Sequence, residues 1–222
     1  MKEAREFIMK CVFILTACVS IAAVVLICIF MFANGIPAIA KIGTLNFLLG
    51  EKWKPMNNIF GILPMIVGSI YVTAGAIIIG VPIAFFASVY LAKFCNEKLY
   101  KILKPAVELM AGIPSVVYGW VGLTVLVPAI KTVFDRQVGH SILAAGLVLA
   151  VMIFPTITSV AADALHSVPK ECRMAAYGLG STRWQTIYRI VVPAAAPGII
   201  SGVILGLARA FGEALAVAMV IG

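Results

Sequence analysis

Two ionisable residues stand four positions apart inside an apolar segment near the end of the chain. Arg209 and Glu213 lie within residues 197–222, which otherwise have the composition of a membrane-spanning helix. A charge at the centre of a bilayer costs about 2.5–3.5 kcal/mol, so such residues usually face a bundle interior or a polar path. An arginine at this depth could bind an anion in transit. The alternative is an ion pair on one helix face that neutralises itself.

Residues 112–119 form a second polar interruption in an apolar segment. They combine a proline, two glycines and two hydroxyl groups, which weakens the helical backbone, and irregular backbone at membrane depth is tolerated only under protein or beside a polar cavity. Ser115 and Tyr118 could hydrogen-bond a permeating ion, or Ser115 could bond its own backbone. We interpret Glu108 as structural, in the first turn of a helix that begins at Pro105.

The remaining chemistry-bearing residues do not form a catalytic or metal-binding set. His140 and His166 have no carboxylate or cysteine at ligand spacing, and the five cysteines show neither a disulfide nor a metal pattern. The apolar segments contain no nucleophile beside a base. We therefore expect no enzyme activity, no cofactor and no metal.

The composition places the chain in a membrane. Hydrophobic residues make up 63% of the 222 residues, charged residues only 12%, and the mean hydropathy is +1.10. A spanning helix needs about 20 apolar residues, and the segments of that length are residues 7–33, 59–92, 106–130, 141–164 and 197–222. A cleavable signal peptide is the alternative for the first, but its apolar run exceeds the usual length of such a region. We predict an all-α polytopic membrane protein with five spans.

The basic residues predict the orientation, because they favour the cytoplasmic side of short loops. The inside group is Lys2, Arg5, Lys10, Lys93, Lys98, Lys101, Lys104, Lys170, Arg173, Arg183 and Arg189, and the outside group is Lys41, Lys52, Lys54, Lys131 and Arg136. The net charge of +8 is thus mainly an orientation signal and implies no nucleic-acid partner. The N-terminus is expected inside and Gly222 outside. A sixth span, absent here, would complete the bundle.

Residues 167–196 form a long, half-polar connection on the predicted cytoplasmic side. Residues 170–177 are compatible with a helix that ends at Gly178 and Gly180. Thr182 and Gln185 fit a capping box at the start of a second helix, which we expect to stop at Pro193. The pair of helices either lies on the membrane surface or docks a cytosolic partner.

This connection resembles the EAA loop of binding-protein-dependent ABC importer permeases. The matching residues are Val168-Pro169-Lys170-Glu171, Ala175-Ala176, Gly180, Trp184, Ile190, Pro193 and Pro197-Gly198. Met174 stands where that family has a glutamate. Three further stretches are similar to the PstC-type permeases of phosphate importers: residues 60–64, 112–119 and 208–213.

The resemblance implies the type I ABC importer permease (MetI-like) fold, with residues 1–58 as an N-terminal helix and external loop and residues 59–222 as a core domain. It implies a substrate pathway at Arg209, Glu213, Ser115 and Tyr118. ATPase coupling would involve Glu171, Met174, Ala175, Ala176, Gly180, Trp184, Ile190 and Pro193. The implied partners are a second homologous permease (PstA-like), two cytosolic ATPase subunits (PstB-like) and an extracytoplasmic phosphate-binding protein (PstS-like). The implied location is the cell inner membrane, whose lipid would surround the spans.

Two other functions fit the sequence. The same fold could import another oxyanion, such as sulfate, molybdate or a phosphonate, because one arginine recognises charge more readily than identity. The chain could instead be a membrane scaffold that senses phosphate without conducting it.

Overall fold

The computed structural model describes residues 2–135 and 138–221. Arg136 and Gly222, which enter the predicted topology, lie outside the described residues. The chain divides into two compact units, Met1–Ile66 and Val67–Gly222, and each is considered by itself.

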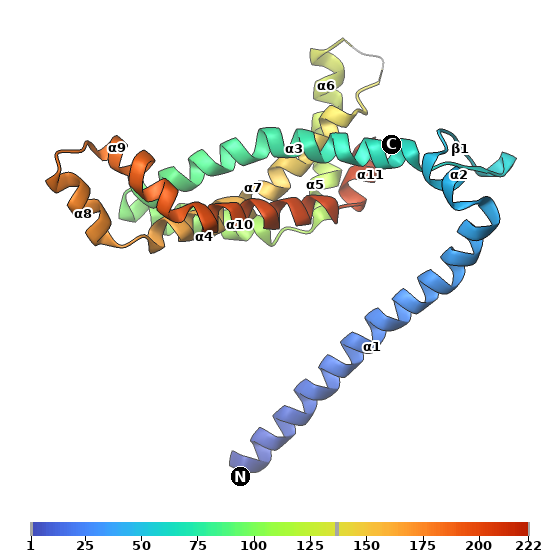
Figure 1. Cartoon of the computed structure of the whole chain (residues 1–222), viewed down its shortest axis with the longest axis horizontal. Helices are drawn as coiled ribbons and strands as arrows, with labels where there is room; N and C mark the ends of the chain where they lie inside the picture. The colour runs from blue at the N-terminus through green and yellow to red at the C-terminus, as the bar shows by residue number, and fades with distance from the viewer. Residues whose placement is uncertain (1, 136–137, 222) are drawn as a thin grey trace. The chain divides into compact units, whose positions relative to one another are not determined.

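The first unit begins with one long helix, α1 (Lys2–Ile42), drawn in blue in Figure 1. The sequence predicts a span over residues 7–33 and a loop from residue 34, so the predicted loop start is wrong. Pro37 lies inside the helix. A proline removes one hydrogen bond of the helical ladder, but in apolar surroundings the helix remains the structure that satisfies the other backbone groups.

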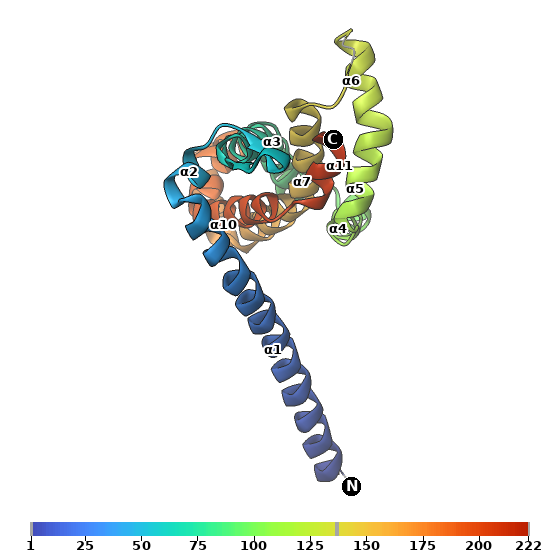
Figure 2. The same cartoon turned by 90° about the vertical axis from the view of Figure 1, so that its right-hand side faces the viewer.

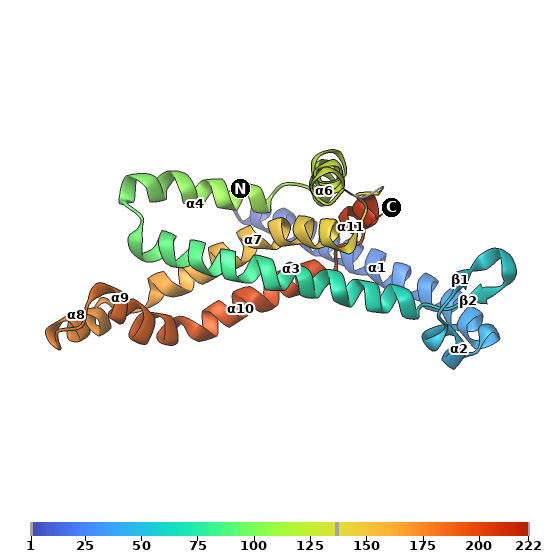
Figure 3. The ribbon, with the colours of Figure 1, turned by 90° about the horizontal axis from the view of Figure 1, so that it is seen from above.

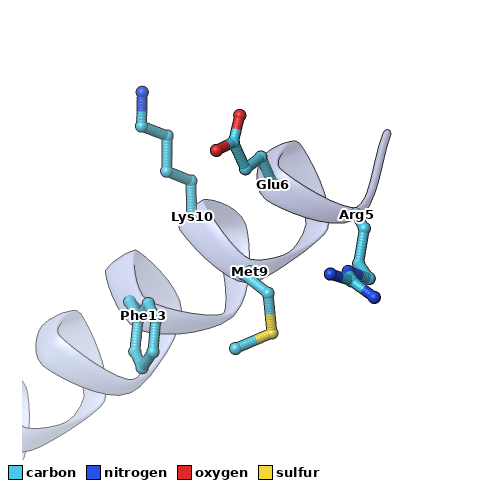
Figure 4. Close-up of a pocket in the computed structure, with 5 residues that line it drawn as sticks. All are labelled: Arg5, Glu6, Met9, Lys10 and Phe13. Carbon is cyan, nitrogen blue, oxygen red and sulfur yellow. The ribbon is translucent and has the colours of Figure 1, made fainter. Parts of the chain in front are cut away.

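A shallow recess along the first turns of α1 is lined by Arg5, Glu6, Met9, Lys10 and Phe13. Figure 4 shows that all five side chains project from this one helix, with Glu6 and Lys10 on one side and Arg5 on another. A surface formed by the first turns of a single helix encloses nothing. We therefore assign no site there.

A short helix and a two-stranded hairpin complete the first unit. The helix is α2 (Thr44–Leu49), and β1 (Trp53–Lys54) pairs antiparallel with β2 (Ile59–Phe60) around the 3₁₀ turn η1 (Pro55–Asn57). The Trp53 and Phe60 rings lie edge to face with centroids 5.6 Å apart. Residues 59 and 60 therefore belong to a strand, and the second span begins later than the predicted residue 59.

The second unit is a bundle in which α3, α7 and α10 run alongside one another (Figures 1 and 3). Its elements are α3 (Leu63–Val89), η2 (Tyr90–Phe94), α4 (Glu97–Ala111), α5 (Ser115–Val121), η3 (Gly122–Leu126), α6 (Val127–Val133), α7 (Ile142–Ser167), α8 (Lys170–Gly178), α9 (Arg183–Thr186), η4 (Ile187–Val191), α10 (Val192–Phe211) and α11 (Leu215–Ile221). The largest fully buried side chains of α7 are Leu149, Met152, Ile153, Ile157 and Leu165, so this helix is the centre of the core.

A row of glycines lets α10 pack backbone to side chain against α7. Gly198, Gly202 and Gly206 recur every fourth residue and so share one helix face. A Cβ atom at Gly206 would lie 2.6 Å from Cγ1 of Ile157, and one at Gly202 would lie 3.3 Å from Cβ of Val160. Small residues at this spacing let helices approach closely where lipid removes the hydrophobic driving force.

Wide π-helical turns precede two prolines inside helices. The turn η3 ends two residues before Pro128, and η4 ends two residues before Pro193. In η4 the Val192 N–H donates to the Ile187 carbonyl, five residues back. The wider turn accommodates a residue that has no N–H and whose ring would clash with an ordinary helical carbonyl. The prediction that Pro193 stops its helix is therefore wrong: α10 continues to Phe211.

Five helices of the described residues are long and apolar enough to cross a membrane: Arg5–Ile42, Leu63–Phe94, Ser115–Val133, Ile142–Ser167 and Arg183–Phe211. The predicted number of spans and the all-α class are confirmed. The bounds of the third and fifth spans differ from the sequence prediction of residues 106–130 and 197–222.

The later start of the third span and the earlier end of the fifth arise from interruptions in the helices. Pro105 lies inside α4, which begins after Asn96 and ends at Ala111, so Glu108 is not in a first turn. Residues 112–114 then separate α4 from α5, and Figure 2 shows the α5–α6 segment running across the direction of α7 and α10. A second break at residues 212–214 separates α10 from α11. The predicted weakening of the backbone over residues 112–119 is confirmed at residues 112–114, whereas residues 115–119 are helical.

Candidate functional site

Arg209 lies in the last turn of α10 and links three helices. Its Nη1 donates to Oγ1 of Thr156 on α7 at 3.2 Å, and its Nη2 donates to the Ala111 carbonyl oxygen at 3.2 Å. Ala111 is the last residue of α4, where the carbonyl groups lack a helical partner. Arg209 therefore connects the C-terminal end of α4, where the chain breaks before α5, to the central helix α7.

Glu213 does not form the predicted pair with Arg209. The helix ends at Phe211, so the two residues no longer share a helix face, and Glu213 Oε1 accepts a hydrogen bond from the Ala216 N–H at 3.2 Å. Within the described part of the chain, no carboxylate oxygen lies within 4.0 Å of Arg209. The interpretation as a self-neutralising ion pair on one helix is therefore wrong, because Glu213 caps α11 instead.

The charge of Arg209 is thus held by neutral oxygens. Its two hydrogen bonds use two of the five N–H donors of a guanidinium group. A hydroxyl and a carbonyl oxygen solvate the cation but do not cancel its charge, and a half-buried charge without a counter-ion attracts an anion. This arrangement can bind an oxyanion.

Thr156 locates Arg209 along the bundle. It stands 14 residues after the start of α7 at Ile142 and 11 before its end at Ser167. At 1.5 Å per residue, the Arg209 hydrogen bond lies about 16 Å from the α8 end of this helix. Arg209 therefore lies near half the height of the central helix.

The break between α4 and α5 holds the other two predicted pathway residues. The Tyr118 hydroxyl donates to the Met110 carbonyl oxygen at 2.8 Å, which ties α5 back to the last turn of α4. Ser115 is the first residue of α5 and is half buried. Since Arg209 bonds Ala111 in the same turn of α4, the structure brings Arg209 and Tyr118 to the same helix end.

A small cavity of about 60 Å³ lies beside Glu213. Ser69 and Thr73 on α3 line it together with Leu149 and Val217. Thr73 is only 4% exposed. Ala210 and Phe211, which directly follow Arg209 on α10, also line the cavity, so it adjoins the end of that helix.

Sequence reasoning did not identify Thr156, Ala111, Ser69 or Thr73 as functional candidates. Thr156 stands beside Pro155 in an apolar segment, which is a readable signal. Ala111 contributes a backbone carbonyl oxygen at a helix end, and its residue type gives no sign of this role. Thr73 and Ser69 are separated by one turn of α3 and resemble ordinary small packing residues.

The predicted coupling segment contains two short helices. The capping box is confirmed: Gln185 N–H donates to Thr182 Oγ1, and the Gln185 side chain accepts from the Thr182 N–H. Gly180 separates α8 from α9 with φ of +81°, a conformation that favours glycine. The second helix begins at Arg183 and continues through the π-helical turn into α10, so it is longer than predicted.

The predicted coupling residues are mostly exposed. Met174 is 68% exposed and Trp184 is 58% exposed, whereas Ala176 is buried and Ile190 is half buried. The other exposed members are Glu171, Ala175, Gly180 and Pro193. Leu179 and Tyr188, which were not singled out, are also strongly exposed, so the segment presents an apolar surface.

The start of α9, in the middle of this segment, contacts η2. The Arg183 guanidinium group donates to the Lys93 carbonyl and lies 5.0 Å from the centroid of the Phe94 ring. The Trp184 ring also contacts Phe94, with centroids 6.2 Å apart. The start of α9 is therefore held against η2, which continues α3.

The two histidines serve other contacts. His140 Nδ1 lies 2.9 Å from the Val220 carbonyl oxygen, and the His166 ring lies 5.3 Å from that of Tyr100. Among the described residues, no group of three or more histidine, cysteine, aspartate or glutamate side chains could hold a metal ion.

Comparison with known proteins identifies the family. Residues 80–222 match the family of binding-protein-dependent transport system inner membrane components. The probable ABC transporter permease protein YqgH of Bacillus subtilis is 46% identical over 94% of this chain and 70% of its own length. Phosphate transport system permease proteins PstC of Mesorhizobium japonicum and Xylella fastidiosa are each 36% identical, over 88% and 94% of this chain and over 65% and 71% of their own lengths. The chain is therefore a multi-pass membrane protein of the binding-protein-dependent transport system inner membrane component family.

Proposed function

We propose that this chain is the permease subunit of an ATP-driven importer of inorganic phosphate and forms half of its translocation path. The observation that carries the proposal is the Arg209 guanidinium group, which is held by neutral oxygens at the end of one interrupted helix and against another. Discontinuous helices with exposed polar ends are typical of substrate sites in membrane transporters. Relatives named as phosphate transport permeases support the substrate.

In this proposal Arg209 binds phosphate, and Tyr118 and Ser115 shape the adjoining backbone break. Glu213 keeps a negative charge further along the path and so limits how tightly the anion binds. Passage needs binding that is weak enough to reverse. The chain itself carries out no bond chemistry.

The proposed partners are a second homologous permease, two cytosolic ATPase subunits and an extracytoplasmic phosphate-binding protein. Residues 167–196 would dock an ATPase through the exposed side chains of α8 and α9, with Met174 and Trp184 at the contact. Residues 1–58 would form the N-terminal helix and external loop, and residues 59–222 the permease core. The proposed orientation places the N-terminus in the cytoplasm.

Substitution of Arg209 tests the function. Arg209→Gln removes the charge but keeps hydrogen-bonding groups, and we expect phosphate uptake by proteoliposomes with the complete importer to fall at least about 10-fold while ATPase assembly is retained. Arg209→Lys keeps the charge but loses the planar fork that meets two phosphate oxygens, so it should restore uptake only in part.

Uptake at the wild-type rate by Arg209→Gln, at matched protein content, would refute the assignment. Competition by sulfate, molybdate and a phosphonate separates phosphate import from import of another oxyanion. A non-conducting scaffold would show no uptake with any of them.

A further inference from the structure

A second cation lies on the contact between α4 and α7. Lys104 Nζ donates to Oδ1 of Asp163 on α7 and lies 3.9 Å from Oε1 of Glu108, one turn further along α4. It also lies 5.9 Å from the centroid of the Tyr100 ring. The hydrogen bond from Lys104 to Asp163 raises the pKa of Lys104 above its ordinary value, so the ammonium group stays charged.

Like Arg209, this cation connects α4 to α7, but its partners are carboxylates and not neutral oxygens. Arg209 bridges Ala111 on α4 and Thr156 on α7, and Lys104 joins residue 104 on α4 to residue 163 on α7. Lys104 precedes Ala111 by seven residues on α4, and Asp163 follows Thr156 by seven residues on α7. The two helices are therefore antiparallel at this contact. Figure 3 shows these helices running along the bundle. Seven residues correspond to about 10 Å, so Lys104 lies two turns closer to the end of α7 that leads into α8.

The carboxylate partners of Lys104 are exposed, more so than Lys104 itself. The side chains of Asp163 and Glu108 are 57% and 53% exposed, whereas that of Lys104 is 26% exposed. An ion pair with exposed partners is weak, because water solvates a carboxylate that swings away. The contact with Tyr100 holds the lysine in place when its carboxylate leaves.

Lysine also suits a transient site. Its ammonium group is a strongly hydrated point charge, whereas the arginine fork of Arg209 binds two oxygens at once. An anion released from Arg209 would therefore meet a weaker site about 10 Å away. Multiple weak sites in sequence allow an ion to leave as well as enter.

We propose that Lys104 is a second anion-binding residue, which receives phosphate after it leaves Arg209 and before it leaves the bundle beside α8. The inference rests on the proposed import of phosphate. Lys104 lies at the contact between α4 and α7, and Asp163 competes with phosphate for its ammonium group.

Substitutions at Lys104 and Asp163 separate this role from a structural ion pair. Radiolabelled phosphate uptake and ATP hydrolysis are measured in proteoliposomes with the complete importer for Lys104→Gln, Lys104→Arg and Asp163→Asn. Lys101→Gln is the matched control, because Lys101 is an exposed lysine on the same helix. Arg209→Gln is measured beside them.

We expect Lys104→Gln to reduce uptake about 5- to 20-fold, Lys104→Arg to recover most of it, and Asp163→Asn to leave uptake at or above the wild-type rate. Lys101→Gln should leave uptake unchanged. If Asp163→Asn is as harmful as Lys104→Gln, the pair is a structural clamp and the inference is wrong.

Wild-type uptake by an assembled Lys104→Gln complex would overturn the inference as well. If Arg209→Gln also transports normally, the proposed import path itself is wrong. A loss confined to Arg209→Gln leaves that path standing and removes only the role of Lys104.

Discussion

At the residue scale, the side chain of Glu213 links two functions in one carboxylate. Its Oε1 caps α11 through the Ala216 N–H, and the same side chain lines the cavity beside Thr73. Loss of a capping carboxylate typically costs about 0.5–2 kcal/mol of helix stability. The negative charge and the cap can be separated by mutation.

Glu213→Gln keeps a carbonyl oxygen for the Ala216 N–H but removes the charge. We therefore expect the importer to assemble and to keep its thermal stability within a few degrees, while phosphate turnover falls several-fold because the anion is released more slowly. Uptake rate and apparent affinity of the reconstituted importer measure this. Glu213→Ala is the comparison, since it removes cap and charge together. Equal losses of stability and of turnover in both variants would contradict the separation.

How far the sequence predicts the site depends on which atoms form it. Arg209 is identifiable because a charge inside an apolar segment demands an explanation. Its partner Ala111 is not, because the acceptor is a backbone carbonyl freed by the end of α4. The separation of Glu213 from Arg209 depends on a break at Gly212, and a single glycine in an apolar run does not reveal whether the helix stops.

At the element scale, the turn between α8 and α9 gives the coupling segment its shape. Gly180 has φ of +81°, and its N–H donates to the Tyr177 carbonyl at 2.9 Å. A side chain in this conformation is strained by about 1–2 kcal/mol. The direction in which α9 leaves α8 therefore depends on one glycine.

Gly180→Leu should lower the coupling of ATP hydrolysis to phosphate uptake, because the strained turn changes the presentation of α9. Gly178→Leu is the matched control: a Cβ at either glycine meets no atom within 4 Å, but only Gly180 has positive φ. We expect a several-fold lower ratio of phosphate imported to ATP hydrolysed for the first variant and little change for the second. The docking proposal fails if the two variants behave alike.

The helices themselves were largely predictable, and their interruptions less so. Length and hydropathy predict five spans, and the Thr182–Gln185 capping box predicts the start of α9. The helix end predicted at Pro193 was wrong, because a proline usually ends a helix but does not do so here. The π-helical turn at residues 187–191 depends on the fit of its side chains in the core, where Ile187 and Val191 are buried, and local sequence alone does not report that fit.

At the scale of the whole molecule, the proposed orientation places the coupling segment and the N-terminus on the same side of the membrane. The number of helices between them fixes this relation: four spans separate the N-terminus from α8. Cys172 lies on α8 and is exposed, so it reports the side of this segment.

In a variant without Cys11, Cys18, Cys28 and Cys95, we expect Cys172 to resist a membrane-impermeant maleimide in intact cells and to react after permeabilisation. The basic residues around α8 favour the cytoplasmic side, which the reagent does not reach. Gel-shift detection of the labelled protein measures the reaction. Labelling in intact cells would contradict the proposed topology. The variant Cys172→Ser is the negative control.

The glycine row of α10 has a consequence for sequence variation. A Cβ atom would lie 2.4 Å from Ala164 at Gly198 and 2.6 Å from Ile157 at Gly206, and it would make a tight contact of 3.3 Å with Val160 at Gly202. On the other face of the helix, Ile200, Ile204 and Phe211 are exposed. Substitutions along α10 should therefore be tolerated in a rhythm of four residues, with almost no freedom on one face and wide freedom on the other. Arg209 follows this row on the same helix. The close packing that the glycines allow between α10 and α7 therefore also sets the distance between Arg209 and Thr156.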